Sequence, residues 1–574
     1  MITQWPRHSA GLAHYGLVRR YPVDTSIEKH FCSTNRFRVL RGHDYFIDGE
    51  VIFPDHDYKL TPYLTYRTHY GWSFAHDGII YAKTDRNMRF ALRRILGARE
   101  PPDSLEWDEF KRASSEEEIT LAIQSYDALL RRNQKFLICN RKEEIAECFY
   151  SSFGVPYFEM DKVDAAVELS KMKHNKQQLR IRDILDRYKN GQVGMASWLE
   201  YVLLKMKPDE IAKPGKYGRM IVDLGVGASL EAGLWADAMK HHFEDKPFLY
   251  KDSACYFCSS PDPVKVQQYF DMMHTHSYHV LMVVFSDDAI VSIQTTPGNY
   301  FVFNLDISSC DTSHTPDLFE LLFDIMCCPP DIRDALHHQI MSNMIIHSRS
   351  GKKVVLQPLE YYLQSGITIT TLINSFSQFL MLMAITDSNC TTAEEVILAC
   401  GQAGYKVTID ECLKYEDLQF LKMSPTLSTD GNWYATLNLG VILRASGTCR
   451  GDIPTHKKGQ SLARSAEIFQ SQLMSGLLSG IDHPTLNLLA PCGVNRSEEN
   501  YALAAKHVDA LAFVNHRSVP HKFDDRIFNR YDLDSVDIQE LKSLIADSAY
   551  GTCAYSIAAS KILTKDYALK TPLA

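Results

Sequence analysis

Residues 279–306 read HVLMVVFSDDAIVSIQTTPGNYFVFNLD, and this stretch decides the fold. Two apolar runs, His279–Phe285 and Ala289–Ile293, are interrupted only by the sequence SDD at residues 286–288. Apolar runs of this length joined by a short polar segment are typical of a β-hairpin. We therefore predict a hairpin that carries acidic side chains at its tip.

A third strand is predicted directly after the hairpin. Residues 295–299 have turn composition, and the apolar run Tyr300–Leu305 that follows ends in Asp306. Because adjacent strands lie about 4.8 Å apart, the carboxylates of Asp287 and Asp306 can share cations at one edge of the sheet. Carboxylates suit magnesium-type ions, and a pair of such ions can activate a hydroxyl and stabilise a triphosphate. The pattern is compatible with a site for two cations, although an S-D-D segment between two strands is more often a plain turn.

The composition bounds the class of protein. The chain has 574 residues, which predicts two to four lobes, and 45% hydrophobic with 23% charged residues is typical of a folded protein. A net charge of −9 argues against a protein that coats nucleic acid but allows a local basic channel. We expect no signal peptide and no transmembrane segment. Cys255 and Cys258 form a lone C-x-x-C, for which reduced thiols are expected rather than zinc.

Elsewhere the pattern predicts mixed helices and strands. Helices are expected at 115–133, 161–190, 198–206, 263–274, 366–385 and 393–401, and after the Thr315-Pro316-Asp317 start signal. Strands are expected at 220–222 and 405–409, with a hairpin of 418–423 and 433–439.

Six stretches together resemble the motifs of viral RNA-directed RNA polymerases. Residues 304–311 (NLDISSCD), 364–374 (QSGITITTLIN) and 284–289 (VFSDDA) resemble motifs A, B and C, with Ser in place of the commoner Gly in motif C. Residues 205–221, 404–410 and 418–422 resemble the basic motif F, motif D and motif E. The resemblance covers residues 200–440, and neither end of the chain shows a match.

The order of these motifs departs from most such polymerases. The acid-tipped hairpin precedes motif A, whereas motif C usually follows motif B. The order F–C–A–B–D–E is that of permutotetraviruses and birnaviruses, and the Asp-Asp tip is closer to the permutotetravirus pattern. Such a permutation is physically tolerable because the strands still meet in one sheet and only surface connections change.

The resemblance implies a metal site and a ribose sensor. Asp306 and Asp287 are expected to bind both magnesium ions, for which manganese can substitute. Asp288 is expected as an outer ligand or as a shaper of the turn, and the backbone of Ile307 as a further ligand. The remaining residues belong to nucleotide binding: Asp311 and Asn374 as the pair that senses the ribose 2′-hydroxyl, helped by Ser365, Gly366 and Thr370.

The basic residues receive their roles from the same resemblance. Lys216 and Arg219 are the candidates for triphosphate contact, because Arg binds phosphate in a bidentate manner and Lys offers a point charge. Lys205, Lys207 and Lys213 line an RNA channel or lie on a solvated loop. A general acid that protonates pyrophosphate is expected at Lys406 or Lys414, and Lys422 is expected to contact the primer backbone.

The expected fold is an α/β (α+β) right hand. It places the N-terminal extension and fingers at 1–195, fingers with motif F at 196–262, the palm at 263–440 with a fingers insertion at 326–360, and a mainly helical thumb at 441–574. The palm is expected to contain a three-stranded antiparallel core sheet. RNA template, primer or product strand and nucleoside triphosphates are the implied partners, with other viral replication proteins or capsid, in the host cytoplasm or the virion.

Two rival functions remain at this stage. A reverse transcriptase also has a palm with an x-D-D hairpin, but it normally carries a bulky aromatic residue where Asp311 falls. A non-catalytic viral RNA-binding or structural protein is expected to be basic or built mainly of short strands, whereas this chain is acidic and mixed. Incorporation of ribonucleotides or deoxynucleotides, and its loss in Asp306→Ala, separates these functions.

Overall fold

The computed structural model is a mixed α/β structure, as predicted. It describes residues 85–159, 201–207, 218–224, 230–244, 246–258, 262–347, 353–445, 462–505, 519–547 and 556–567, together with short segments at 2–4, 32–34, 36–42, 45–47, 50–52, 73–74, 79–80, 211–212 and 552–554 and single residues at 186 and 190. None of the helices in these ranges is long and apolar enough to cross a membrane.

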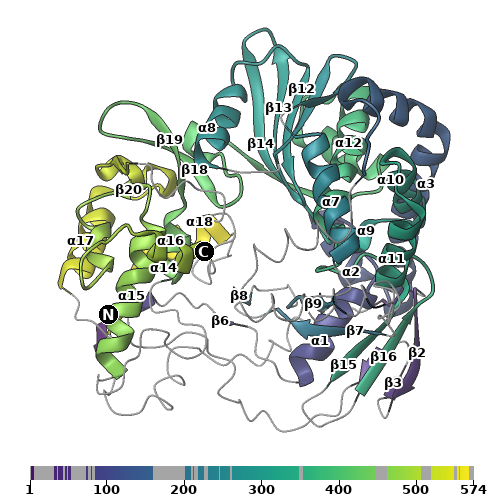
Figure 1. Cartoon of the computed structure of the whole chain (residues 1–574), viewed down its shortest axis with the longest axis horizontal. Coiled ribbons are helices and arrows are strands. Elements are labelled where there is room, and N and C mark those ends of the chain that lie inside the picture. The colour runs from purple at the N-terminus through teal and green to yellow at the C-terminus, as the bar shows by residue number, and fades with distance from the viewer. Residues whose placement is uncertain are drawn as a thin grey trace.

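A six-stranded sheet holds the stretch that the sequence singled out (Figure 1). Its spatial order is β10-β11-β12-β13-β14-β17, in which β11 and β12 run parallel and the other neighbours run antiparallel. The strands span Pro247–Tyr250, Ser253–Phe257, Val280–Phe285, Asp288–Thr296, Asn299–Ile307 and Val407–Glu411. The three predicted strands therefore exist, within a sheet twice as wide as expected, and the predicted strand at 405–409 lies at its edge.

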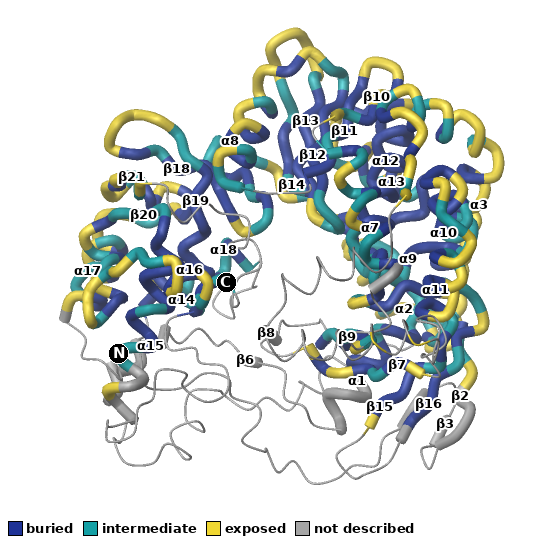
Figure 2. The backbone as a smooth tube through the Cα atoms, in the orientation of Figure 1, coloured by how far each residue is buried: buried dark blue, intermediate teal, exposed yellow. Residues whose placement is uncertain are grey.

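Both faces of this sheet are buried, which explains the uninterrupted apolar runs (Figure 2). Side chains alternate along β12, so Val280, Met282 and Val284 belong to one core while Leu281 and Val283 belong to another. The first core contains α12 (Thr370–Asp387) and α13 (Ala393–Gln402), and the second contains α8 (Pro263–Met272). A sheet packed on both faces offers polar groups only at its ends, where the acids lie.

A second, five-stranded sheet joins distant parts of the chain in the order β2-β16-β15-β7-β9. The strands span Phe37–Gly42, Lys353–Pro358, Asn343–His347, Tyr201–Met206 and Met220–Asp223. The predicted helix at 198–206 is therefore wrong from residue 201 on. The short run YVLLKM pairs with both neighbouring strands, and tertiary pairing overrides its local pattern.

Helices surround the two sheets. The predicted helix at 115–133 is α3, which runs from Glu116 to Phe153 and starts with a capping box between Ser115 and Glu118. The predicted helix at 161–190 lies almost entirely outside the described residues. The remaining helices of this half are α1 Asp85–Leu96, α2 Leu105–Ala113, α7 Leu230–His242, α9 Cys310–Ser313, α10 Pro316–Ile325 and α11 Pro330–Met341.

A C-terminal helical unit with its own core lies on the left in Figure 1. Its helices are α14 Leu439–Ala445, α15 Leu462–Leu477, α16 Glu498–Ala505, α17 Ser535–Asp547 and α18 Ile557–Tyr567. The predicted hairpin precedes it as β18 (Met423–Leu427) and β19 (Trp433–Leu437). The expected strand at 418–423 is wrong, because Leu421 and Lys422 adopt left-handed backbone angles and form a tight turn before β18.

Arg530 joins the C-terminal unit to the segment before this hairpin. Its Nη1 donates to the carbonyl oxygens of Glu416 at 2.7 Å and Asp417 at 2.9 Å, and its Nη2 donates to Oε1 of Gln419 at 2.7 Å. The buried carboxylate of Asp566 accepts from Nε at 3.1 Å. Removing one member would leave a buried charge unpaired, so the junction is strongly held.

Candidate functional site

The acid-tipped turn and the end of β14 meet as the sequence predicts. In the antiparallel pair β13–β14, Asp288 lies directly opposite Asp306, and in the pair β12–β13 Asp288 lies opposite Phe285. Directly opposite residues project from the same face with Cβ atoms about 5 Å apart. Asp287 stands at the tip between the two strands, so the three acids gather at one end of the sheet.

The electrostatics show how closely these acids interact. The side chain of Asp288 is exposed at the end of β13. Desolvation of its carboxylate, followed by repulsion from Asp287, raises the pKa of Asp288 to about 7, and Asp306 adds to the rise. The charges of Lys422 and Arg219 act in the opposite direction. One residue each from the predicted motifs E and F therefore faces the acidic turn.

Helix α12 holds the acidic turn from behind. Ser286 has a φ of 58°, a left-handed conformation that is costly for a residue with a Cβ atom. Its backbone N–H donates to Oγ of Ser375 at 2.8 Å, and its carbonyl accepts from Nε2 of Gln378 at 3.2 Å. Its own hydroxyl oxygen accepts from Nδ2 of Asn374 at 3.2 Å. These three bonds fix the direction in which Asp287 and Asp288 leave the sheet.

The donor set suits hard divalent cations. Asp306 and Asp288 are exposed and present carboxylate oxygens from neighbouring strands, while Ile307 is buried and contributes backbone only. In the part of the chain that is described, no three acidic, His or Cys side chains are drawn together as a preformed cage. Like charges repel without a cation between them, so these acids are gathered at one edge but not closed around a centre.

A second polar group, the hydrogen-bonded pair of Asp311 and Asn374, lies beside the acids, and we name it the ribose corner after the role that the sequence predicts for it. Nδ2 of Asn374 donates to Oδ1 of Asp311 at 2.9 Å. Burial raises the pKa of Asp311, and the Asn374 donor and the charge of Arg219 partly offset the rise. Asp287 also acts on Asp311, which places the corner next to the acidic turn.

The turn after β14 brings Asp311 into this position. Ser309 has a φ of 56°, and its carbonyl accepts from the backbone N–H of Thr312 at 3.1 Å and the hydroxyl of Ser313 at 2.9 Å. The short helix α9 that follows begins at Cys310, whose thiol has its pKa raised by burial and then by the charges of Asp287, Asp311 and Asp306. The D-x4-D spacing thus converts one strand end into two separate polar positions.

The loop before α12 packs against β9, the strand that follows the predicted motif F. The backbone N–H of Val222 donates to the carbonyl of Ser365 at 2.8 Å. Gly366 has a φ of 99°, and a Cβ atom there would lie 2.7 Å from the carbonyl oxygen of Val222. Only glycine fits this approach. The hydroxyl of Thr370 donates to the carbonyl of Ile367 at 2.7 Å, so in this structure it stabilises the start of the helix.

The predicted basic residues fall into two groups. The charge of Arg219 lowers the pKa of both Asp288 and Asp311, and its contact with a triphosphate stays a prediction. Lys205 forms a salt bridge with Asp223 on the neighbouring strand, and the backbone N–H of Lys207 donates to the carbonyl of Arg219 at 2.8 Å. Lys213 and Lys216 lie outside the described residues.

The two candidates for the general acid are engaged away from the acidic turn. Nζ of Lys406 donates to the carbonyl oxygens of Glu100 and Pro101, both at 2.9 Å. Lys414 forms a salt bridge with Asp532 and donates to the carbonyl of Asn529 at 2.7 Å. Lys422 differs, because its charge acts on Asp288 and its ammonium lies 5.4 Å from the ring centroid of Tyr567.

Sequence reasoning missed the residues that support this site. They share burial and a hydrogen bond to one of the predicted residues or to its backbone segment. They are Arg36, Gln134, His314, Ser375, Gln378 and Tyr405. One signal was present, because the polar residues NSFSQ at 374–378 interrupt an otherwise apolar helix. Buried polar groups in such a helix need partners, and here the partner is the acidic turn.

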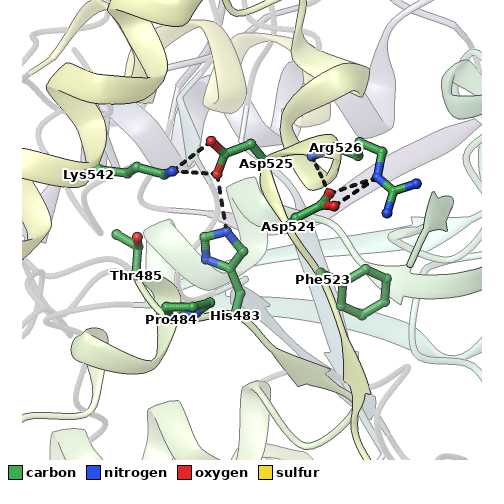
Figure 3. Close-up of a pocket in the computed structure, with 8 residues that line it drawn as sticks. All are labelled: His483, Pro484, Thr485, Phe523, Asp524, Asp525, Arg526 and Lys542. Carbon is green, nitrogen blue, oxygen red and sulfur yellow. Dashed lines mark hydrogen bonds and ion pairs between the residues drawn. The ribbon is translucent and has the colours of Figure 1, made fainter. Parts of the chain in front are cut away.

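A pocket in the C-terminal unit is built from other residues (Figure 3). Lys542 forms a salt bridge with Asp525 at 2.5 Å, and Nε2 of His483 lies 3.7 Å from the same carboxylate. Arg526 pairs with Asp524 at 2.8 Å. The charged side chains that line the pocket are paired with one another, and none of the residues predicted from the sequence lines it.

Comparisons with known proteins give matches in structure but not in sequence. No protein-family model matches the chain, and no curated protein matches it. The structure is similar to the RNA polymerase VP1 from infectious pancreatic necrosis virus, with a TM-score of 0.37 and 12% identity over 73% of this chain and 65% of that chain. It is also similar to the birnavirus VP1–VP3 complex, with a TM-score of 0.36 and 12% identity over 56% of this chain. The chain spans 65% of the length of the first of these proteins and 45% of the length of the second.

Proposed function

We propose that the chain is an RNA-directed RNA polymerase with a permuted palm, which transfers a nucleotidyl group from a nucleoside triphosphate to an RNA 3′-end. The observation that carries this proposal is the register that sets Asp288 opposite Asp306, with Asp287 next to Asp288 in the turn between β12 and β13. The acidic hairpin of β12 and β13 comes before β14 in the chain. Strand β13 pairs with β14, so the acids of the hairpin and Asp306 lie at the same end of the sheet. Viral genome replication and transcription is the setting in which such an enzyme acts.

The acidic turn would hold two magnesium or manganese ions. Asp306 and Asp287 would bind both ions, with Asp288 and the carbonyl of Ile307 as further ligands. The bound ions supply activation of the primer 3′-hydroxyl and stabilisation of the triphosphate and pyrophosphate charge. The protein contributes the placement: α12 fixes Ser286, and with it the direction of the carboxylates.

The ribose corner supports ribonucleotides as the substrate. Asp311 and Asn374 are a hydrogen-bonded polar pair next to the acids, where a bulky aromatic residue would exclude the 2′-hydroxyl. A site that hydrogen-bonds a substrate hydroxyl rejects the analogue that lacks it, because its polar groups are then left unpaired. This pair favours an RNA polymerase over a reverse transcriptase.

The surrounding cations support binding of a triphosphate and an RNA strand. Arg219 faces the acids from the strand side, and Lys422 faces them from the turn before β18. We assign the triphosphate to Arg219 and the primer backbone to Lys422, because Arg219 belongs to the stretch that resembles motif F and Lys422 to the stretch that resembles motif E. Contacts of this kind act on phosphate charge and carry no base sequence.

The test is nucleotide incorporation on a primed homopolymer with magnesium. The purified chain is expected to extend an RNA primer with ribonucleotides, and Asp306→Ala is expected to lower the rate at least about a thousandfold, since the reaction then lacks a ligand of its ions. Asp317→Ala is the matched control, because Asp317 lies in the first turn of α10 and its Oδ1 accepts from the thiol of Cys139 on α3. It is expected to leave the rate unchanged.

Three results would contradict the proposal. Equal incorporation rates in the wild type and in Asp306→Ala would contradict the proposed role of Asp306 as a metal ligand. Extension with deoxynucleotides in preference to ribonucleotides would assign the chain to the reverse transcriptases. RNA binding without any incorporation in either metal would leave a non-catalytic RNA-binding protein.

A further inference from the structure

A chain of hydrogen bonds runs from the ribose corner into the protein interior. Oδ1 of Asn374 lies 2.7 Å from Nε2 of His314, and Nδ1 of His314 lies 3.1 Å from the hydroxyl of Tyr405. All three side chains are buried, with His314 and Tyr405 fully inaccessible to solvent. Neither His314 nor Tyr405 belongs to the residues assigned above to the reaction.

The chemistry of the end groups fixes the direction of every bond. An ionised Asp311 can only accept, so the Asn374 amide must face it with Nδ2 and must turn Oδ1 toward the imidazole. Nε2 of His314 therefore carries the proton and donates. Burial lowers the pKa of His314 to about 4, so the ring is neutral and Nδ1 is left to accept from Tyr405. The neutral ring thus allows one orientation of the amide.

The backbone that carries His314 is held from the N-terminal third of the chain. Arg36 donates from Nη1 to the carbonyl of Thr312 at 2.9 Å and from Nη2 to the carbonyl of His314 at 3.1 Å. Oε1 of Gln134, on α3, accepts from the backbone N–H of Thr315 at 2.7 Å and from its hydroxyl at 2.8 Å. The imidazole therefore projects from a segment fixed on both sides, and it can act as a rigid support.

We propose that His314, oriented by Tyr405, is a positioning residue that sets the discrimination between ribonucleotides and deoxynucleotides. It locks the Asn374 amide in the one orientation that presents Nδ2 to Asp311. The inference rests on the proposed polymerase function, and it adds residues that never touch the substrate. A group held in advance by its neighbours recognises its ligand without reordering when the ligand binds.

The experiment compares three variants for kcat/KM with a ribonucleotide and with the matching deoxynucleotide. His314→Leu removes the donor, and the ribose-to-deoxyribose ratio is expected to fall about tenfold, the effect of one hydrogen bond. His314→Gln retains an N–H at the Nε2 position and is expected to keep most of the ratio. Tyr405→Phe removes only the hydroxyl that fixes the imidazole, and a fall of about threefold is expected.

A matched control separates positioning from stability. His276 is also buried, has a pKa lowered by burial to about 4, and bonds Oγ of Ser292 at 2.8 Å away from the acidic turn. His276→Leu is expected to destabilise the protein to a similar extent, as measured by thermal unfolding, and to leave the ratio unchanged. A purely structural role for His314 would lower both kcat/KM values equally, so the ratio distinguishes the two roles.

The outcomes are separable from those of the proposed function. An unchanged ratio in His314→Leu would overturn the inference while the polymerase assignment stands. Should His314→Leu fail to fold, Tyr405→Phe decides, and an unchanged ratio in that variant overturns the inference. A wild-type chain that incorporates no nucleotide at all would overturn the proposed function instead.

Discussion

The acidic turn and the ribose corner are neighbours with opposite physical designs. Asp288 and Asp306 are exposed carboxylates on paired strands, and no described side chain neutralises them by direct contact. Asn374 is buried and bonded through both of its polar atoms, and His314 behind it is bonded through both ring nitrogens. Chemistry on a phosphate needs charge that stays available to cations, whereas selection of a sugar needs groups that cannot move.

One helix serves both designs. Asn374 belongs to the ribose corner, while Ser375 and Gln378, one and four positions further along α12, bond the backbone of Ser286 in the acidic turn. The turn is thereby anchored through its main chain, which leaves its carboxylates free of internal bonds. The two regions thus differ in the atoms that have hydrogen-bond partners. In the acidic turn these are backbone atoms, and in the ribose corner they are side-chain atoms.

The largest effect is expected from a substitution that breaks the buried hydrogen bonds of the ribose corner. Asn374→Ala removes the donor to Asp311 and leaves the imidazole of His314 without its acceptor, so the preference for ribonucleotides over deoxynucleotides is expected to fall between about a hundredfold and a thousandfold. Single-nucleotide incorporation with each substrate measures it. Thr386→Ala is the control on the same helix, since the buried Thr386 hydroxyl has no hydrogen-bond partner in the described ranges. A preference that survives Asn374→Ala would show that the corner is not the sensor.

A smaller effect is expected from protonating His314, which lies behind the ribose corner. The pKa of His314 is lowered by burial to about 4 from an ordinary value of 6.5. The unfolded chain therefore binds more protons than the folded chain as the pH falls from about 6.5 toward 4, and stability is complete above that window and lost within it. His314→Gln is expected to flatten the decline by about 2 kcal/mol, measured by urea unfolding at several pH values.

A second buried histidine, His276, provides the control for this pH dependence of stability. His276 has a pKa lowered by burial in the same way and lies away from the corner. His276→Gln should flatten the pH dependence of stability to a comparable extent but leave nucleotide selection untouched. An identical decline with pH in the wild type and in both variants would contradict the buried, neutral state of these rings.

The smallest effect is expected where the two regions meet. Ser286→Gly relieves the left-handed strain at a φ of 58° and loses one weak acceptor for Asn374, so the free energy of unfolding should change by less than about 1 kcal/mol. Ser286→Val keeps the strain, adds a β-branched side chain and should cost about 1–3 kcal/mol. Urea unfolding of both variants measures the difference. Equal stability of the two would contradict a strained left-handed backbone at residue 286.

Much of the acidic turn and its strands could be predicted from the sequence, because the sequence signals for them are local. The apolar runs on either side of residues 286–288 specify strands buried on both faces, and the acids at their ends stand out against them. Gly366 was also predictable, because its left-handed backbone against Val222 requires glycine. The run YVLLKM at 201–206 was misassigned, because its strand character depends on pairing with residues 343–345.

The ribose corner and the side chains behind it could be predicted only in part, because their hydrogen bonds connect segments that are distant in the chain. Asp311 and Asn374 follow from their motifs, but the bonds of Asn374 to His314 and of His314 to Tyr405 span 60 and 91 positions. Gln134 reaches Thr315 across 181 positions. No periodicity records such pairs. The N-terminal end of the chain shows no motif match, yet Arg36 and Gln134 support the segment behind the corner.

The junction at Arg530 limits how far the C-terminal unit can separate from the segment before β18. Its guanidinium bonds the carbonyls of Glu416 and Asp417 on one side and the Asp566 carboxylate on the other. Widening at this junction would leave a buried charge unpaired, so we expect the C-terminal unit and this segment to move together.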